Sequence, residues 1–152
     1  MRQAHPNDIA TLVDLMNEFY AESDYELDRP LAEKAFADIL ADTRLGYVWI
    51  VDKNGKDVGY VVVTLRYGME YGGSIACIDD LFVIPQSRNR GLSTAALLQV
   101  RDFCKSIGVR AITVEVGHSN GPAQTVYRRI GLAEVPGRQL LALALASPAH
   151  VV

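Results

Sequence analysis

The segment from Gln86 to Thr94, QSRNRGLST, joins a strand-like apolar stretch to a stretch of small and apolar residues. A helix that begins here would expose unpaired backbone N–H groups and the positive end of its dipole, which together attract anions. Gly91 would let a ligand approach the backbone, while Arg88 and Arg90 raise the local positive potential. These residue types indicate a phosphate-binding loop, although an ordinary strand-to-helix turn with surface arginines fits the loop alone equally well.

Two familiar nucleotide loops are excluded. The sequence contains no G-x-x-x-x-G-K-[ST] segment. A dinucleotide fingerprint needs three glycines and an acidic residue about twenty positions later. Only Gly91 is present, and Arg110 and Ala111 occupy the later position.

No metal site is expected. The histidines at positions 5, 118 and 150 are scattered and form no ligand pattern. Cys77 and Cys104 lie in apolar contexts without metal-ligand spacing, which is typical of reduced thiols that act as small hydrophobic residues.

The overall composition is that of a globular domain. The chain has 152 residues, of which 49% are hydrophobic and 22% charged, enough for one domain with a full core. No apolar run approaches the length of a membrane span, and the N-terminal segment lacks a signal-peptide pattern, so we expect a cytoplasmic protein. The net charge of -3 argues against nucleic acid as a partner.

The elements that must position the loop follow from periodicity. Apolar residues at helical spacing predict a helix over 9–20. A second helix should carry Pro30 in its first turn and point Leu31, Ala35, Ile39 and Leu40 inward. After Gly46, β-branched and aromatic runs flank the hairpin pair Asn54-Gly55, and SIACIDDLFVI reads as a third long strand.

The second half of the chain alternates between the two periods. We expect a helix from Leu92 to near Gly108, a strand in RAITVEV, a short helix between Pro122 and Gly131, and a final strand within RQLLALALA. The predicted fold class is therefore α/β (α+β), with a mixed, mostly antiparallel sheet flanked by helices. We expect a single domain over 1–146 and a C-terminal tail over 147–152.

Two segments carry a family resemblance. VIPQSRNRGLSTAALL resembles the acyl-CoA-binding segment of the GNAT N-acetyltransferase superfamily, Q/R-x-x-G-x-G/A at the start of the central helix, with Arg88, Gly91 and Ser93 at the marked positions. Ser93 replaces Gly or Ala but is still small. NGPAQTVYRRIGL is similar to the family's N-x-x-A-x-x-x-Y-x-x-x-G-F segment, with Leu132 in place of Phe. The resemblance runs from about Arg2, in the short first strand, to Leu132.

The resemblance implies a GNAT-like fold and acetyl-CoA as cofactor. The backbone of Phe82 and Val83 would pair with the pantetheine arm, Asn120 would bond the pantetheine region, and Tyr127, on one helix face with Asn120 and Ala123, would point at the thioester sulfur and protonate the leaving thiolate. The pyrophosphate would be held by backbone amides of Arg88, Asn89, Arg90, Gly91, Leu92, Ser93 and Thr94.

Transfer to an amine requires a neutral nucleophile. A lysine-like amine is neutral only to roughly one part in two thousand at pH 7, so a general base or a water chain is useful. DDLFV resembles EDFFV of polyamine N-acetyltransferases, which implies that Asp79 is the base, with a bridging water because its side chain is shorter. Since successive strand residues face opposite sides, we expect only one of Asp79 and Asp80 to face the acceptor. For Asp80, a cap or a salt bridge is an equal alternative.

The acceptor is predicted from acids and aromatics. Glu18 to Asp28 holds five acids and no base, and RYGMEYGG adds tyrosines and a glutamate. Acids and aromatics together suit a cationic amine, such as a polyamine or an amino sugar. The candidate acceptor-binding residues are Tyr20, Tyr25, Tyr67, Glu70, Tyr71 and Asp80.

The predicted activity is therefore acetyl transfer from acetyl-CoA to a small cationic amine by direct attack in a ternary complex. A protein lysine or N-terminal acetyltransferase, a non-catalytic CoA-binding module and a structural interaction domain stay as alternatives. A homodimer that pairs through LLALALA is a further expectation.

Overall fold

A computed structural model describes residues 1–145 and contains a five-stranded sheet in the order β1-β2-β3-β4-β5. The strands are β1 (Arg2–Gln3), β2 (Gly46–Lys53), β3 (Lys56–Gly68), β4 (Gly73–Val83) and β5 (Ala111–Val114). Neighbours from β1 to β4 are antiparallel, whereas β5 joins β4 in parallel. The predicted mixed, mostly antiparallel sheet is confirmed.

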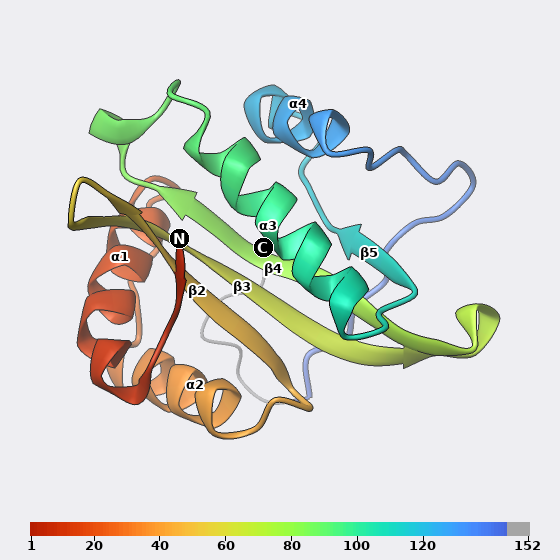
Figure 1. Cartoon of the computed structure of the whole chain (residues 1–152), viewed down its shortest axis with the longest axis horizontal. Coiled ribbons are helices and arrows are strands. Elements are labelled where there is room, and N and C mark those ends of the chain that lie inside the picture. Colours follow the sequence, from red (N-terminus) through yellow and green to blue (C-terminus); the bar gives the residue numbers. More distant parts are fainter. Residues whose placement is uncertain (146–152) are drawn as a thin grey trace.

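Helices cover both faces of this sheet. They are α1 (Ile9–Ala21), α2 (Arg29–Ala41), α3 (Leu92–Ser106) and α4 (Gly121–Arg129). Alternate residues of β3 point to opposite faces, so Tyr60 and Val62 pack with α1 and α2, while Val61 and Val63 pack with α3 and α4. Figure 1 shows α3 crossing the near face of the sheet. The result is a three-layer α/β/α arrangement.

Local sequence signals place the first elements. Asn54 and Gly55 adopt φ of 51° and 75° and form the two-residue turn between β2 and β3. Asp28 caps α2, because its carboxylate accepts a hydrogen bond from the Leu31 N–H at 3.0 Å. Of the predicted inward residues of α2, Ile39 and Leu40 pack against the core. The prediction is wrong at Leu31, which is 47% exposed, and at Ala35, which is also exposed. The helix instead buries Ala32 and Phe36, one residue out of the expected phase.

A β-bulge interrupts β4. Asp80 pairs with Val62 and Ile78 pairs with Val63, so Asp79 is an extra residue without a partner in β3. Ladder pairing between β4 and β5 ends at the same point, with Ile78 opposite Val114. The two strands therefore separate where the bulge bends β4.

The predicted final strand is wrong for the described part of RQLLALALA, because residues 138–145 form no strand. The leucines at 140, 141, 143 and 145 are between 68% and 93% exposed. Alternation matches a strand's period, but a strand also needs a pairing edge, and among the described strands β5 has β4 as its one neighbour. Arg138 instead pairs with Glu70 at 2.9 Å. Residue 146 and the predicted tail over 147–152 lie outside the described residues.

Within residues 1–145, no helix combines the length and the apolarity needed to cross a membrane.

Candidate active site

A cleft of about 410 Å³ lies between the sheet and the helices α1 and α2. Its floor comes from β3 and β4, and its walls come from α1, α2 and Leu45, the residue before β2. The residues that line it are Met16, Ala35, Phe36, Asp38, Ile39, Leu45, Val62, Thr64, Leu65, Asp79 and Asp80. It is thus largely apolar, with two adjacent carboxylates in its floor.

Both acids of the DDLFV segment line this cleft. In a regular strand they would face opposite sides of the sheet, but the bulge inserts Asp79 before the residue that pairs with Val62. The expectation that only one of the two acids faces this side is therefore wrong. The physical reason is the extra residue, which cancels the alternation locally.

Asp80 is held by a tyrosine from the neighbouring strand. The Tyr60 hydroxyl donates a hydrogen bond to Asp80 Oδ2 at 2.8 Å. Burial raises the pKa of Asp80 to about 6, because the bond from Tyr60 only partly offsets desolvation and the negative charge of Asp79 adds to it. Burial also raises the pKa of Asp79. A carboxyl that titrates near neutrality can exchange a proton with a substrate.

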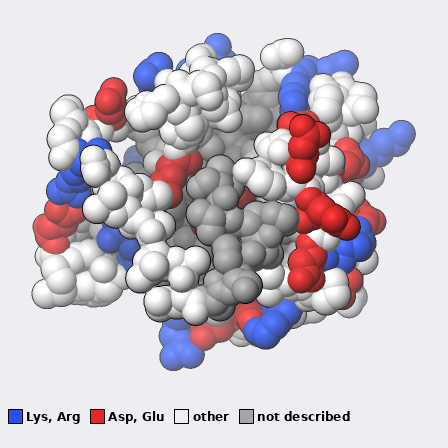
Figure 2. Space-filling view, turned by 180° about the vertical axis from the view of Figure 1, so that it is seen from behind, with Lys and Arg blue, Asp and Glu red and all other residues white. Residues whose placement is uncertain are grey.

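Tyr20 lies within electrostatic reach of both acids. Burial raises its pKa to about 12, and the charges of Asp80 and Asp79 contribute. Figure 2, a view from behind, shows acidic side chains gathered on the side of this face where α1 lies. Tyr25, also predicted to bind the acceptor, is half-buried in the segment between α1 and α2. The two carboxylates that act on Tyr20, Asp79 and Asp80, suit a cationic ligand.

Tyr127 approaches the same acids from the other side of the sheet. It is buried in the core formed with α3 and α4. Burial raises its pKa to about 12, followed by the charges of Asp80 and Cys77. Its phenol is therefore protonated at neutral pH and can donate a proton. Asn120 caps α4, its Oδ1 accepting a hydrogen bond from the Ala123 N–H at 3.2 Å.

The loop before α3 has the backbone of an anion site. Gly91 is the N-cap at φ of 77°, Asn89 also has a positive φ of 59°, and no side chain caps the helix. The first amides of α3, from Leu92 to Thr94, therefore have no side-chain acceptor in the N-cap. A fifteen-residue helix adds the positive end of its dipole at this point.

Arg88 points away from these amides. Its Nε donates to the Val83 carbonyl at 2.7 Å, and its guanidinium pairs with Glu22 and lies 5.5 Å from the centre of the Phe82 ring. Arg88 thus ties the loop to β4 and to α1, whereas the Arg90 side chain is exposed.

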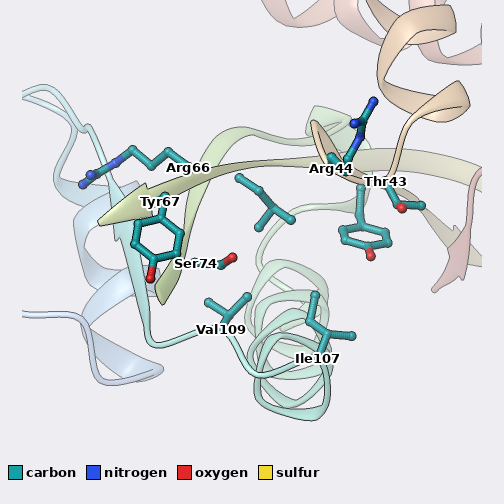
Figure 3. A pocket seen from close by; sticks show the side chains of 9 residues that line it. Thr43, Arg44, Arg66, Tyr67, Ser74, Ile107 and Val109 are labelled. Carbon is teal, nitrogen blue, oxygen red and sulfur yellow. The ribbon is translucent and has the colours of Figure 1, made fainter. Parts of the chain in front are cut away.

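Three of the predicted acceptor residues lie elsewhere. Tyr67 pairs with Ser74 at the far ends of β3 and β4, and Glu70 and Tyr71 belong to the turn that follows. Tyr67 lines a separate hollow of about 360 Å³ together with Tyr47, Ile107 and Val109, shown in Figure 3. Glu70 is paired with Arg138. The structure therefore does not bring these three residues to the cleft of Asp79 and Asp80.

Sequence reasoning missed Tyr60 and the apolar walls of the cleft. Tyr60 meets Asp80 only because β3 and β4 pair in one particular register, with Tyr60 opposite Phe82. A tyrosine inside an otherwise aliphatic run, VGYVVV, was the available signal, since a buried hydroxyl needs a partner. Among the described residues, no group of three or more His, Cys, Asp or Glu side chains is placed to hold a metal ion.

Known proteins share both the sequence pattern and the fold. A sequence model of the "Acetyltransferase (GNAT) family" matches residues 9–132. The uncharacterized N-acetyltransferase YhfO of Bacillus subtilis (strain 168) is 27% identical over 140 residues, which cover 90% of this chain and 91% of YhfO.

Solved structures agree. Integron cassette protein HFX_CASS3, from the mobile metagenome of Cole Harbour Salt Marsh, is 42% identical with a TM-score of 0.89, over 97% of this chain and 91% of that one. The aminoglycoside N-acetyltransferase AAC(6')-Iy, solved in complex with CoA, shares the fold with a TM-score of 0.80 at 17% identity, over 95% and 93% of the two chains. Because the family model matches residues 9–132, most of this chain, the chain belongs to the GNAT family and is an acyl-CoA-dependent N-acyltransferase.

Proposed function

We propose that the protein transfers an acetyl group from acetyl-CoA to the primary amine of a small molecule, by direct attack within a ternary complex. The observation that carries the proposal is the bulge at Asp79. It turns two carboxylates into one cleft at the point where β4 separates from β5. A cationic amine held by these carboxylates would lie next to a thioester bound where β4 and β5 separate.

Acetyl-CoA would bind on the side of α3 and α4. Backbone amides from Arg88 to Thr94 would hold the pyrophosphate. The backbone of Phe82 and Val83, where the Val83 carbonyl already accepts a hydrogen bond from Arg88, would pair with the pantetheine arm, with Asn120 and Ala123 beside it. The uncapped α3 N-terminus supports this binding mode. AAC(6')-Iy, which has the same fold, was solved with CoA bound.

The two acids would have different roles toward the amine. Asp79 would hold the incoming ammonium, and Asp80, with a pKa of about 6, would accept its proton directly or through water. This division reverses the order that the EDFFV resemblance implies, because Asp80 has the oriented hydrogen bond from Tyr60.

Transfer then needs one bond formed and one broken. The nitrogen lone pair attacks the thioester carbonyl carbon, the C–S bond breaks, and the sulfur takes the Tyr127 hydroxyl proton as the amide forms. The Tyr127 pKa of about 12 keeps that proton available at neutral pH. Asp80 releases the first amine proton to solvent, and the second amine proton, lost from nitrogen as the amide forms, returns to the Tyr127 phenolate, so that one proton is released in each turnover.

The test is release of CoA thiol from acetyl-CoA with a panel of primary amines and a peptide with a free N-terminus. Asp80→Asn and Tyr127→Phe should each lower kcat by about 10²-fold, in the usual range for a lost acid or base. Asp102→Asn, an exposed carboxylate on α3 paired with Arg101, is the matched control and should leave kcat unchanged. Release with the peptide alone would replace the small-molecule acceptor by a protein one, and no release with any amine would overturn the proposal.

A further inference from the structure

We propose that the acceptor is a primary monoamine carried on an apolar alkyl or arylalkyl body, rather than a polyamine or an amino sugar. This inference rests on the proposed function and deepens it. Its basis is the uneven distribution of charge along the cleft of Asp79 and Asp80.

The carboxylates occupy one end of the cleft. Asp80 lies opposite Val62 on β3, and Asp79, the unpaired bulge residue, precedes it in β4. From Val62 the lining continues along β3 to Thr64 and Leu65, which is two to three residues, or about 7–10 Å. The Leu65 side chain itself packs on the other face of the sheet, with the core of α3 and α4. An acceptor whose ammonium sits at the acids would therefore extend its body toward Thr64 and the Leu45 rim.

The other end of the cleft is apolar. Ile39 of α2 reaches over Gly46, since a Cβ added to Gly46 would lie 3.0 Å from Ile39 Cδ1, and Gly46 is the residue paired with Thr64. Leu45, 48% exposed, precedes Gly46 at the rim. The end away from the acids thus offers aliphatic side chains to the ligand.

Few polar groups are available between the two ends. Beyond Asp79 and Asp80, the polar side chains that line the cleft are Thr64 and Asp38. Asp38 already pairs with Lys34 one turn earlier in α2. A second ammonium at the far end would reach only the exposed carboxylate of Asp38, which is already shared with Lys34, and exposed ion pairs contribute little. The hydroxyls of an amino sugar would find few partners among the apolar walls.

The walls suit hydrocarbon. Met16 of α1 and Phe36 of α2 line the cleft, and an unbranched methionine adapts to ligands of different shape. A cleft of about 410 Å³ has room for an alkyl chain or an arylalkyl group but is small for a sugar oligomer. Apolar contact along the body would orient the nitrogen at the acids.

The decisive comparison uses two acceptors of equal length. Heptylamine and 1,6-diaminohexane have the same number of heavy atoms and differ in one terminus, which is a methyl group in the first and an ammonium in the second. We expect kcat/KM in the CoA thiol-release assay to be about tenfold or more higher for heptylamine, because the cleft removes water from the second charge and offers it only the exposed carboxylate that Asp38 shares with Lys34. Phenethylamine should resemble heptylamine, and glucosamine should resemble the diamine.

A substitution at the rim should shift this preference. Leu45→Asp places a carboxylate at the apolar end, and the partial exposure of Leu45 makes the substitution tolerable to the fold. The heptylamine-to-diamine ratio of kcat/KM should fall at least about fivefold. Leu31→Asp is the matched control: Leu31 is 47% exposed, lies outside the cleft, and stands in the first turn of α2, where a carboxylate is favourable. It should leave the ratio unchanged.

The outcomes separate this inference from the proposed function. Equal or greater kcat/KM for diaminohexane or glucosamine would overturn the monoamine specificity, while the thiol release itself would still support an amine acetyltransferase. Absence of release with every amine would overturn the proposed function and the specificity with it. If Leu45→Asp fails to fold in a thermal melt, the wild-type ratio alone decides.

Discussion

At the scale of single residues, the site depends on one buried carboxyl whose ionised form is energetically unfavourable. Asp80 is ionised at neutral pH although burial favours its neutral form, and the Tyr60 hydroxyl only partly compensates. A group of this kind lowers the stability of the fold while serving chemistry. Stability measurements can therefore detect it without any substrate.

The Asp80→Asn variant should gain stability relative to wild type as the pH rises. Because the pKa of Asp80 is raised in the folded protein to about 6, its protonated form contributes stability that is complete below the unfolded value and is lost as the pH rises through 6. The difference in unfolding free energy between variant and wild type, measured by urea denaturation, should grow by about 2 kcal/mol from pH 4 to pH 7.

The carboxylates of Asp8 and Asp42 do not disturb this comparison. Arginine partners lower the pKa of Asp8 and of Asp42 to about 2, so those groups lose their contribution only in strong acid, and both proteins contain them. A difference in unfolding free energy that stays constant between pH 4 and pH 7 would show that Asp80 is not destabilised by ionisation.

At the scale of elements, helix α3 carries a glycine in the left-handed region at each end. Gly91 and Gly108 have the same φ of 77°, and a Cβ built on either meets no atom within 4 Å. The two positions differ only in surroundings, since Gly91 belongs to the predicted pyrophosphate loop and Gly108 to the turn before β5. They form a natural pair for separating strain from ligand binding.

Gly91→Ala and Gly108→Ala should destabilise the fold by a similar amount, about 1 kcal/mol, because both place a side chain at positive φ. Only Gly91→Ala should weaken the binding of CoA, with a Kd about tenfold higher, since it disturbs the backbone amides around the proposed pyrophosphate site. Isothermal titration with CoA measures this difference. Equal affinities in the two variants would remove the loop from the binding site.

The same elements show what the sequence could predict. The loop at Gly91 and the helix of Tyr127 are local patterns, in which the spacing of a few residues fixes both the element and its place in the site. The bulge at Asp79 could not be predicted, because it depends on the register between β3 and β4, which fixes Asp80 opposite Val62. Tyr67 was assigned to the acceptor side by its neighbours in the chain, but thirteen-residue β3 carries it to the other end of the sheet.

At the scale of the whole molecule, the sheet is divided by the separation of β4 from β5, and α4 reaches the site across this division. A ligand that bridges the two parts should stabilise the fold as a unit. The exposed leucines at 140, 141, 143 and 145 leave the homodimer a prediction, which sedimentation or light scattering can decide.

CoA at 100 times its Kd should raise the melting temperature by about 5–10 °C, since mass action adds about 2.7 kcal/mol to the unfolding free energy. Adenosine monophosphate at the same concentration is the control, because it lacks the pantetheine arm that would span the division. An unchanged melting temperature at millimolar CoA would contradict binding, whatever the resemblance of the loop.

The bulge has a consequence for how the strand can change in length. On both sides of Asp79 the β3–β4 pairs are in regular register, so the removal of that one residue would join two correct ladders into one. Substitutions in DDLFV alter which side chains enter the cleft, but a single-codon deletion would straighten β4 and extend its edge toward β5. The gap proposed for pantetheine is thus controlled by the number of residues between Ile78 and Leu81, and comparison of strand length among relatives would reveal more about activity than comparison of side chains.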